Sequence, residues 1–512
     1  GFVENIYVER VRANVKRQAL YCDMLGSARW VGELAQRYPA REITPLTPWF
    51  ANISIHDVEI TGCSTLVDVS ALPEKPVKNF FFGNVKAHCD RIGKICDATK
   101  FSMKDVRIES CDTVMRIDNC DYASFFGFSN VTTGSSVKIE KTGGECRYLN
   151  VQTYPLVPVN YQSIRPGEVW LDTEGKPIQA HGFQVTFREG KYYWYGEDKT
   201  HTLFGTNRMF GGVRCYSSTD FYNWKDEGRI IEPATDPHSP LHHCQKLERP
   251  HILYCAKTGR YVCWLKSQSN DGHFVILEAE HFMGPYHFVR NLKPNGFAVG
   301  DFDMYADPDT GKGYVWFERP HWEQICAELS DDYTNVNGRY SEHFVGKVPP
   351  FTREAAAHFV MDGKHYIYTS GTTSYTPNPS EVAVFDDYHG EYTVLGNPHI
   401  GDEYAHSFCS QITSVIKIPG KDLYVAMADR WLPHTNKTDI PKKDWQSFLT
   451  RYKDHRPYPK DFATPKVADR FYTLVNPNQD VYKATYVFLP IVVKDGIPMI
   501  EWKDEWKLEN YE

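Results

Sequence analysis

Polar side chains recur at a nearly constant distance before five glycines in the second part of the chain. Each glycine is followed by a basic residue and an aromatic-rich stretch, at Gly190-Lys191, Gly259-Arg260, Gly311-Lys312, Gly363-Lys364 and Gly420-Lys421. Nine residues before the glycine, or ten in the third case, stand His181, Pro250, Asp301, Glu354 and Gln411. Two carboxyl groups that meet in one site are the minimum for general acid–base cleavage of a glycosidic bond. The set therefore suggests hydrolysis of a sugar linkage, provided that the elements carrying it converge.

The spacing of the glycines predicts such elements. Successive glycines lie 69, 52, 52 and 57 residues apart, which is the length of a small antiparallel sheet with its hairpin tips. Five such sheets fit a five-bladed β-propeller over residues 159–512. A β-sandwich would show turn signals every ~8–12 residues without this longer repeat. Because the strand before each tip would be the innermost of its blade, we expect residues at matching positions to line one mouth of the central channel.

A different repeat occupies residues 1–158. Alternating apolar runs close on Arg10-Val11, Asp57-Val58, Asn84-Val85, Asp105-Val106 and Asn130-Val131, with the valines 47, 27, 21 and 25 residues apart. These intervals predict a solenoid of stacked parallel β-coils. Cys63, Cys89 and Cys111 follow the valines at the same phase, which favours a ladder of buried thiols over disulfides or a ligand set. The sequence indicates helix only near residues 28–38.

The composition agrees with an all-β chain of two domains. Aromatic residues make up 14% of the 512 residues, with 35 glycines and 31 prolines, and this is the profile of short strands joined by turns. A net charge of −8 argues against a nucleic-acid partner, and no apolar run is long enough to span a membrane. Thirteen cysteines without metal-ligand spacing argue against zinc. We expect no cofactor, with a calcium ion in the propeller channel as the open alternative.

Motifs in several of the predicted blades resemble glycoside hydrolase family 43. Arg353-Glu354-Ala355-Ala356 is similar to that family's Arg-Glu-Ala-Pro motif, and Ser370-Gly371-Thr372-Thr373 follows at the expected place. Asp301 with Tyr305–Lys312 is similar to the third-blade aspartate segment, and Ser410-Gln411 with Met427-Ala428-Asp429-Arg430-Trp431 resembles the fifth-blade signature. The resemblance covers about 330 residues. It implies a five-bladed propeller hydrolase that works with inversion.

The first blade departs from the family pattern, because Gln179-Ala180-His181-Gly182 stands where most members have an aspartate base. In this, and in Tyr193–Glu197, the chain is similar to the exo-β-1,3-galactanase branch. That resemblance implies that Glu354 is the general acid, that Asp301 tunes its pKa and orients it, and that Gln411 holds the attacking water. A neutral amide is a poor base. Deprotonation of the water must therefore come late, or a carboxylate such as Glu197 or Glu248 must help.

Further residues are candidates for contact with the sugar. They are Glu197, Glu248, His181, Thr372, Asp429, Arg430 and Trp431. Other interpretations stay open: Glu248 in a rim ion pair with Arg249, His181 as a channel residue or calcium ligand, and Asp429-Arg430-Trp431 as a structural ion pair under an indole. Trp194, Trp264, Trp316 and Trp431 are candidates for a platform that stacks on the sugar ring, although we expect most of them to be core residues. The Lys- and Pro-rich stretch 435–480 is an expected insertion at the pocket rim.

The first domain resembles the C-terminal coils of the polygalacturonase family, glycoside hydrolase family 28, in phrases such as Phe2-Val3-Glu4-Asn5-Ile6. The resemblance implies a partial right-handed β-helix. Residues 1–158 contain no Asn-Thr-Asp, Asp-Asp, Gly-His-Gly or Arg-Ile-Lys motif. We therefore expect no catalysis from this domain, and we expect further coils before Gly1 because an open first coil would leave a strand edge unpaired.

The leading hypothesis is an inverting, exo-acting hydrolase that releases galactose from β-1,3-galactan or arabinogalactan side chains. The alternatives are an α-L-arabinofuranosidase of the same family and an inactive, carbohydrate-binding propeller. An oligo- or polysaccharide is the expected partner, a connection to pectin rests on fold analogy alone, and the expected location is extracytoplasmic, either periplasmic or secreted.

Overall fold

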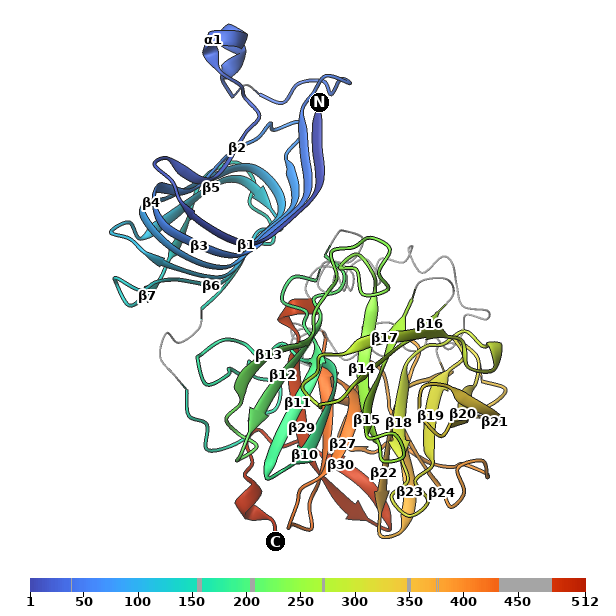
Figure 1. Cartoon of the computed structure of the whole chain (residues 1–512). Coiled ribbons are helices and arrows are strands. Elements are labelled where there is room, and N and C mark those ends of the chain that lie inside the picture. The colour runs from blue at the N-terminus through green and yellow to red at the C-terminus, as the bar shows by residue number, and fades with distance from the viewer. Residues whose placement is uncertain are drawn as a thin grey trace. The chain divides into compact units, whose positions relative to one another are not determined.

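The computed structural model of the chain describes residues 1–37, 39–153, 159–202, 208–268, 272–347, 351–373, 375, 377–431 and 481–512. The chain divides into two compact units, the first covering Gly1–Val159 and the second most of the remaining residues (Figure 1). The insertion predicted for residues 435–480 lies outside the described residues. None of the helices within the described ranges is long and apolar enough to cross a bilayer.

The first unit is built on one mainly parallel, nine-stranded sheet. Its strands are β1 (Phe2–Asn14), β2 (Gln18–Asp23), β3 (Trp49–Ser70), β4 (Val77–Glu109), β5 (Val114–Asp121), β6 (Ser124–Asn130), β7 (Ser135–Ser136), β8 (Lys138–Gly143) and β9 (Asn150–Gln152). The path β1-β3-β4-β5-β8 is parallel throughout, and β1 lies at its edge. Such ladders are consistent with the predicted coils. The expected helical segment is one turn of α1 (Ala28–Val31) and one 3₁₀ turn (Gly32–Ala35).

The residues that precede the repeated valines mark corners of the coils. Arg10, Asp57, Asn84 and Asp105 have positive φ angles of 46–56°, and Val58 lies opposite both Val11 and Val85 in the neighbouring strands. The fifth member of the predicted repeat was misplaced. Val106 lies opposite Phe128, and Gly127 before it has φ 61°, so Gly127-Phe128 takes the place predicted for Asn130-Val131. Glycine adopts this conformation without strain, and the later Asn-Val pair only resembles the repeat.

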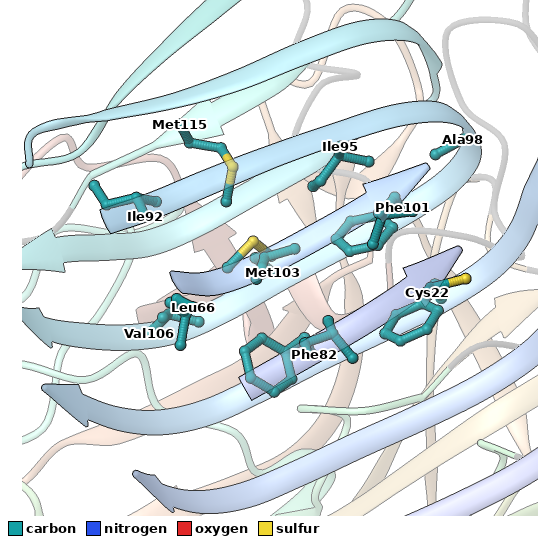
Figure 2. Close-up of a cluster of buried hydrophobic side chains, with 14 of the residues drawn as sticks. Cys22, Leu66, Phe82, Ile92, Ile95, Ala98, Phe101, Met103, Val106 and Met115 are labelled. Carbon is teal, nitrogen blue, oxygen red and sulfur yellow. The ribbon is translucent and has the colours of Figure 1, made fainter. Parts of the chain in front are cut away.

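Apolar side chains from successive strands fill the interior of the first unit (Figure 2). Phe80 stacks on Phe101 with ring centroids 5.1 Å apart. Cys63 and Cys89 are buried opposite each other in β3 and β4, but Cys111 is exposed in the bend after β4. Of the three cysteines predicted to form a buried ladder, two therefore do so. All thirteen cysteines, each within the described ranges, are free thiols.

The second unit consists of five antiparallel sheets, and the predicted all-β five-bladed propeller is confirmed. The first two blades comprise β10 (His181–Arg188), β11 (Lys191–Glu197), β12 (Val213–Ser218), β13 (Lys225–Ile231), β14 (Leu247–Cys255), β15 (Arg260–Ser267), β16 (His273–Ala279) and β17 (His287–Leu292). The next two comprise β18 (Phe302–Ala306), β19 (Gly313–Glu318), β20 (Gln324–Leu329), β21 (Val336–His343), β22 (Arg353–Met361), β23 (Lys364–Gly371), β24 (Glu381–Phe385) and β25 (Thr393–Gly396).

The fifth blade draws on the end of the chain. It contains β27 (Gln411–Lys417), β28 (Tyr424–Arg430), β29 (Thr485–Lys494) and β30 (Ile497–Glu501), with the short β26 (His399–Ile400) parallel to β30. Short 3₁₀ turns cover Pro294–Gly296, Ser407–Cys409, Val481–Lys483 and Leu508–Asn510. A bridge between Ile164 and Trp506 joins the start of the second unit to its C-terminal segment. The ring is thus closed by both ends of the unit, as propellers require.

The five predicted glycines form the tips between the first and second strands of the blades. Their φ angles are 69–80°, a region that favours glycine, which explains the residue type at each tip. The first strands of neighbouring blades lie side by side around the ring. Trp194, Trp264 and Trp316 on the second strands are fully buried between blades, so they are core residues. The tips therefore fix which residues stand at the opposite end of each first strand.

Candidate active site

Asp301, Glu354 and Gln411 meet at one end of the innermost strands β18, β22 and β27. Gln411 Nε2 donates to Glu354 Oε1 at 3.3 Å, and the guanidinium of Arg249 bridges Gln411 Oε1 at 2.6 Å and Asp301 Oδ2 at 2.8 Å. They border a pocket of about 480 Å³. Its lining is Glu197, Lys246, Glu248, Arg249, Lys266, Gln268, Asp301, Glu354, Tyr375, Gln411 and Trp431. The structure thus brings the three residues predicted to be catalytic into a single polar cavity.

Backbone bulges near this end turn the side chains toward the pocket. The ladder register shifts after His181, Glu248, Glu354 and Ile412, in four of the five innermost strands. Arg249 and Ala355 have positive φ angles of 53° and 49° inside two of these bulges. A bulge re-aims the neighbouring side chain. In the second blade the turn between Cys255 and Arg260 is two residues longer than the turn between Met361 and Lys364 in the fourth, so Glu248 and Arg249 line the pocket in place of Pro250 at the predicted offset.

Glu354 is held as a neutral acid by its surroundings. Burial, followed by the negative charges of Asp301 and Glu318, raises its pKa well above the usual glutamate value. The register shift and Gln411 fix where the carboxyl group points. A protonated carboxyl that faces a pocket can donate its proton to a leaving oxygen.

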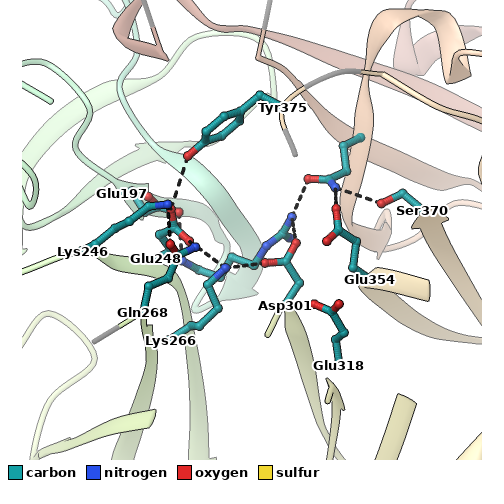
Figure 3. A network of polar contacts seen from close by, with 12 residues as sticks. Glu197, Lys246, Glu248, Lys266, Gln268, Asp301, Glu318, Glu354, Ser370 and Tyr375 are labelled. Carbon is teal, nitrogen blue, oxygen red and sulfur yellow. Dashed lines mark hydrogen bonds and ion pairs between the residues drawn. The ribbon is translucent and has the colours of Figure 1, made fainter. Parts of the chain in front are cut away.

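Asp301 is ionised and held by two cations (Figure 3). Burial alone would raise its pKa, but Arg249 and Lys266 outweigh this and lower the pKa below the ordinary aspartate value. Lys266 Nζ lies 2.6 Å from Asp301 Oδ1 and 2.6 Å from Glu248 Oε2. Asp301 therefore supplies a permanent negative charge beside Glu354, as its predicted role requires.

Gln411 has every amide position engaged. Its Oε1 accepts hydrogen bonds from Arg249 and, at 3.3 Å, from Trp431 Nε1, while its Nε2 donates to Glu354 and, at 2.9 Å, to Ser370 Oγ. A water molecule could bind this amide only by exchange for one of these bonds. The direct contact with Glu354 is also shorter than the ~6.5–9.5 Å that separates the two groups of an inverting pair.

Two further carboxyl groups line the pocket, and their pKa values shift in opposite directions. Burial raises the pKa of Glu197 even though Lys199 forms an ion pair with it, and the backbone N–H of Arg249 donates to it at 2.9 Å. Burial works against ionisation of Glu248 as well, but Lys266 and Lys246 lower its pKa well below the usual value. Figure 3 shows Glu197 and Glu248 on the far side of the network from Glu354.

Four predicted sugar contacts lie elsewhere. His181 and Asp429 are fully buried and bonded to each other at 2.8 Å, and Asp429 also accepts from Gly182 N–H at 2.8 Å, so they join the first and fifth blades instead of facing a ligand. Thr372 is buried and bonded to Thr352 at 2.8 Å. Arg430 points to Phe408 O and the Trp502 ring, because successive residues of a strand face opposite sides. Trp431 does line the pocket.

Sequence reasoning missed several pocket residues that sit on second strands or after them. Lys266, Gln268, Ser370 and Tyr375 belong to this group, and Lys246, just before the first strand β14, was also missed. A usable signal exists for two of them. Folding each hairpin back about its tip places Lys266 opposite Glu248 and Ser370 opposite Glu354. Paired residues in antiparallel strands share a face of the sheet, so each first-strand candidate names a second-strand partner.

The channel itself fits calcium poorly. Gln184, His251 and Asp303 come from three innermost strands and bond to one another, with His251 Nε2 2.9 Å from Asp303 Oδ1. The other oxygen of Asp303 accepts from the backbone N–H of His358 at 2.6 Å. Calcium takes six to eight oxygen ligands, typically from several carboxylates. In the described part of the chain, the donor groups near the axis offer one carboxylate that is already bonded.

Residues 183–415 match the model of glycosyl hydrolases family 43. No curated protein matches the chain significantly. Among solved structures, the family 43 β-1,3-galactosidase BT0265 shares 27% identity at a TM-score of 0.55, over 69% of this chain and 65% of that one. The chain thus spans slightly less than two thirds of that protein.

Two other solved structures show the same likeness. The family 43 β-1,3-galactosidase BT3683, solved with galactodeoxynojirimycin, shares 27% identity at a TM-score of 0.55, over 67% of this chain and 100% of that one. An exo-β-1,3-galactanase from Phanerochaete chrysosporium, solved with galactose, shares the fold at 21% identity and a TM-score of 0.53, over 68% of each chain. The propeller of this chain is therefore similar to family 43 glycosyl hydrolases in both sequence and fold.

Proposed function

We propose that the chain is an inverting, exo-acting hydrolase that releases galactose from β-1,3-galactan or arabinogalactan side chains. The observation that carries this proposal is the meeting of a neutral Glu354, an ionised Asp301 and Gln411 in one pocket. The first blade adds support, because its candidate residue His181 is bonded to Asp429, and among the described residues this blade contributes Glu197 and no aspartate to the pocket lining. This pattern, not the fold alone, separates the proposal from other propeller hydrolases.

In the proposed reaction Glu354 protonates the glycosidic oxygen as the bond to the anomeric carbon breaks. Asp301 keeps the acid protonated before the reaction, and Asp301 and Glu248 offer negative charge to the oxocarbenium-like sugar. Gln411 holds the attacking water after giving up one of its present bonds. Because an amide cannot take the proton of that water, we assign this step to Glu197 or Glu248, which lie across the network from Glu354 (Figure 3).

The pocket lining suits a sugar. It offers carboxylates and amides to hydroxyl groups beside the Trp431 ring. Two structures at 27% identity are β-1,3-galactosidases by name, and this supports galactose as the unit released. A polymeric substrate also supports the expected extracytoplasmic location.

The test is to incubate the full chain with β-1,3-galactobiose and -triose and follow the products by proton NMR. We expect single galactose units that first appear as the α-anomer. A first product in the β-anomer would overturn inversion, and release of internal oligosaccharides would overturn exo action. Turnover of aryl α-L-arabinofuranoside alone would establish the arabinofuranosidase alternative. Binding of the oligosaccharide without turnover, even with an activated leaving group, would establish an inactive propeller.

For the first unit we propose a partial right-handed β-helix, similar to the last coils of polygalacturonases and without catalysis of its own. The parallel ladders and the corner residues support the β-helix. The absence of that family's acidic motifs from residues 1–158 supports the lack of catalysis. Release of galacturonate from polygalacturonan by the Glu354→Gln variant would contradict this assignment.

A further inference from the structure

We propose that Glu318 is a positioning residue that acts with Asp301 to keep the proton on Glu354. The inference rests on the proposed role of Glu354 as the general acid. Glu318 ends β19 and lies outside the pocket lining, so it does not touch the substrate itself. Its influence on the reaction passes through Glu354.

Backbone hydrogen bonds place Glu318 close to Asp301 and Glu354. Its N–H donates to Asp301 O at 2.9 Å, and Gly300 N–H donates to Glu318 O at 2.7 Å. Only 4% of the residue is exposed. Figure 3 shows its side chain beside Asp301 and Glu354 at one end of the network.

Gly300 makes room for the carboxyl group. A Cβ at position 300 would lie 2.1 Å from Glu318 Oε2, which is closer than any real contact. The other oxygen accepts the N–H of His321 at 2.8 Å. The carboxyl group is therefore fixed by the backbone of two segments, and a glycine is needed for its approach.

Glu318 is compensated by cations less than Asp301, which forms ion pairs with both Arg249 and Lys266. The charged groups that face it are Asp301 and Glu354 from the first strands of two blades, Lys266 from β15, and His321 from the following turn. Lys266 is already shared by Asp301 and Glu248, and burial lowers the pKa of His321, which leaves that ring neutral at pH 7. Burial and Asp301 accordingly raise the pKa of Glu318 to about 7.

A carboxyl group at this position is explained by its charge. The oxygen of a glutamine side chain would accept the same backbone N–H groups, and a neutral amide is cheaper to bury than an ionised acid. The charge of Glu318 does one thing that an amide cannot, since it raises the pKa of Glu354. As pH rises through about 7, Glu318 ionises and Glu354 holds its proton more tightly. The acid thus stays protonated further into the alkaline range.

The test is the pH profile of kcat/KM for Glu318→Gln on β-1,3-galactobiose, measured in the full chain. Below about pH 6 the wild type and the variant both carry a neutral group at position 318, so their values of kcat/KM should coincide. Above pH 7 the fall of kcat/KM in the variant should begin about one pH unit below that of the wild type, because a like charge near Glu354 has been removed. At a given pH on this limb the variant should therefore have lost about tenfold in kcat/KM. Glu318→Asp, which keeps the charge, should restore part of the limb.

Matched controls separate this effect from damage to the fold. Glu323 is a buried acidic residue of the same hairpin and pairs with Arg319 at 2.7 Å. Its replacement, Glu323→Gln, should leave the alkaline limb of the pH profile in place. If Glu318→Gln does not fold, Gly300→Ala displaces the carboxyl group and should move the limb in the same direction. A folded variant with an unmoved limb overturns the inference. Full activity of Glu354→Gln would instead overturn the proposed function.

Discussion

Replacing Glu354 by glutamine removes the transferable proton and little else. The amide oxygen can still accept from Gln411 Nε2, which lies 3.3 Å from Glu354 Oε1, and a neutral group replaces a neutral acid in a half-buried position. We therefore expect the midpoint of thermal unfolding to change by no more than a few degrees. Loss of general acid catalysis should lower kcat on β-1,3-galactobiose by about 10²–10⁴-fold, equivalent to about 3–5 kcal/mol.

The assay compares two leaving groups. The dinitrophenolate of a dinitrophenyl β-galactoside leaves as a stable anion and needs no proton. On this substrate Glu354→Gln should therefore lose less than about tenfold in kcat. The ratio of the two losses measures proton donation and is independent of any general damage to the pocket. Equal losses on both substrates would refute the role of Glu354 as acid, and undiminished release of galactose from galactobiose would refute its participation altogether.

Two further substitutions test the surroundings of the acid. Asp301→Asn removes the negative charge that raises the pKa of Glu354, so the alkaline limb of the pH profile should move to lower pH by about one to two units; an unmoved limb would show that the charge does not reach Glu354. Asp429→Ala leaves His181 and the Gly182 N–H without their buried partner and should lower the free energy of unfolding by about 3 kcal/mol, against less than about 0.5 kcal/mol for the exposed Asp422→Ala. Equal denaturation midpoints for these two variants would count against a bridge between blades.

Repeats with a physical cause could be read from the sequence. The five tip glycines stand where the backbone needs positive φ, so their spacing gave the number of blades and the strand that precedes each tip. Asp301, Glu354 and Gln411 followed from that count. In the first unit, Arg10, Asp57, Asn84 and Asp105 mark corners, and three of the four are Asp or Asn, which adopt positive φ more readily than other non-glycine residues.

The rest depends on contacts that no local pattern encodes. The turn between Cys255 and Arg260 is two residues longer than the turn between Met361 and Lys364, so Glu248 and Arg249 stand where the count from the tip glycine predicts Pro250. Asp429 and Trp431 stand two residues apart at the end of one strand, and Trp431 lines the pocket. Asp429 is instead bonded to His181 of another blade. Which carboxyl groups are neutral also follows from the placement of Lys266 and Arg249, which are distant in sequence from Asp301.

The central claim is that Glu354 carries a proton in the resting enzyme, and infrared difference spectroscopy tests it directly. The spectrum of Glu354→Gln is subtracted from that of the wild type near pH 7. We expect a carbonyl band of one protonated carboxylic acid in the wild type that the variant lacks. Loss of a carboxylate band instead would show that Glu354 is ionised at rest, and the enzyme would then have no acid in place to cleave the glycosidic bond.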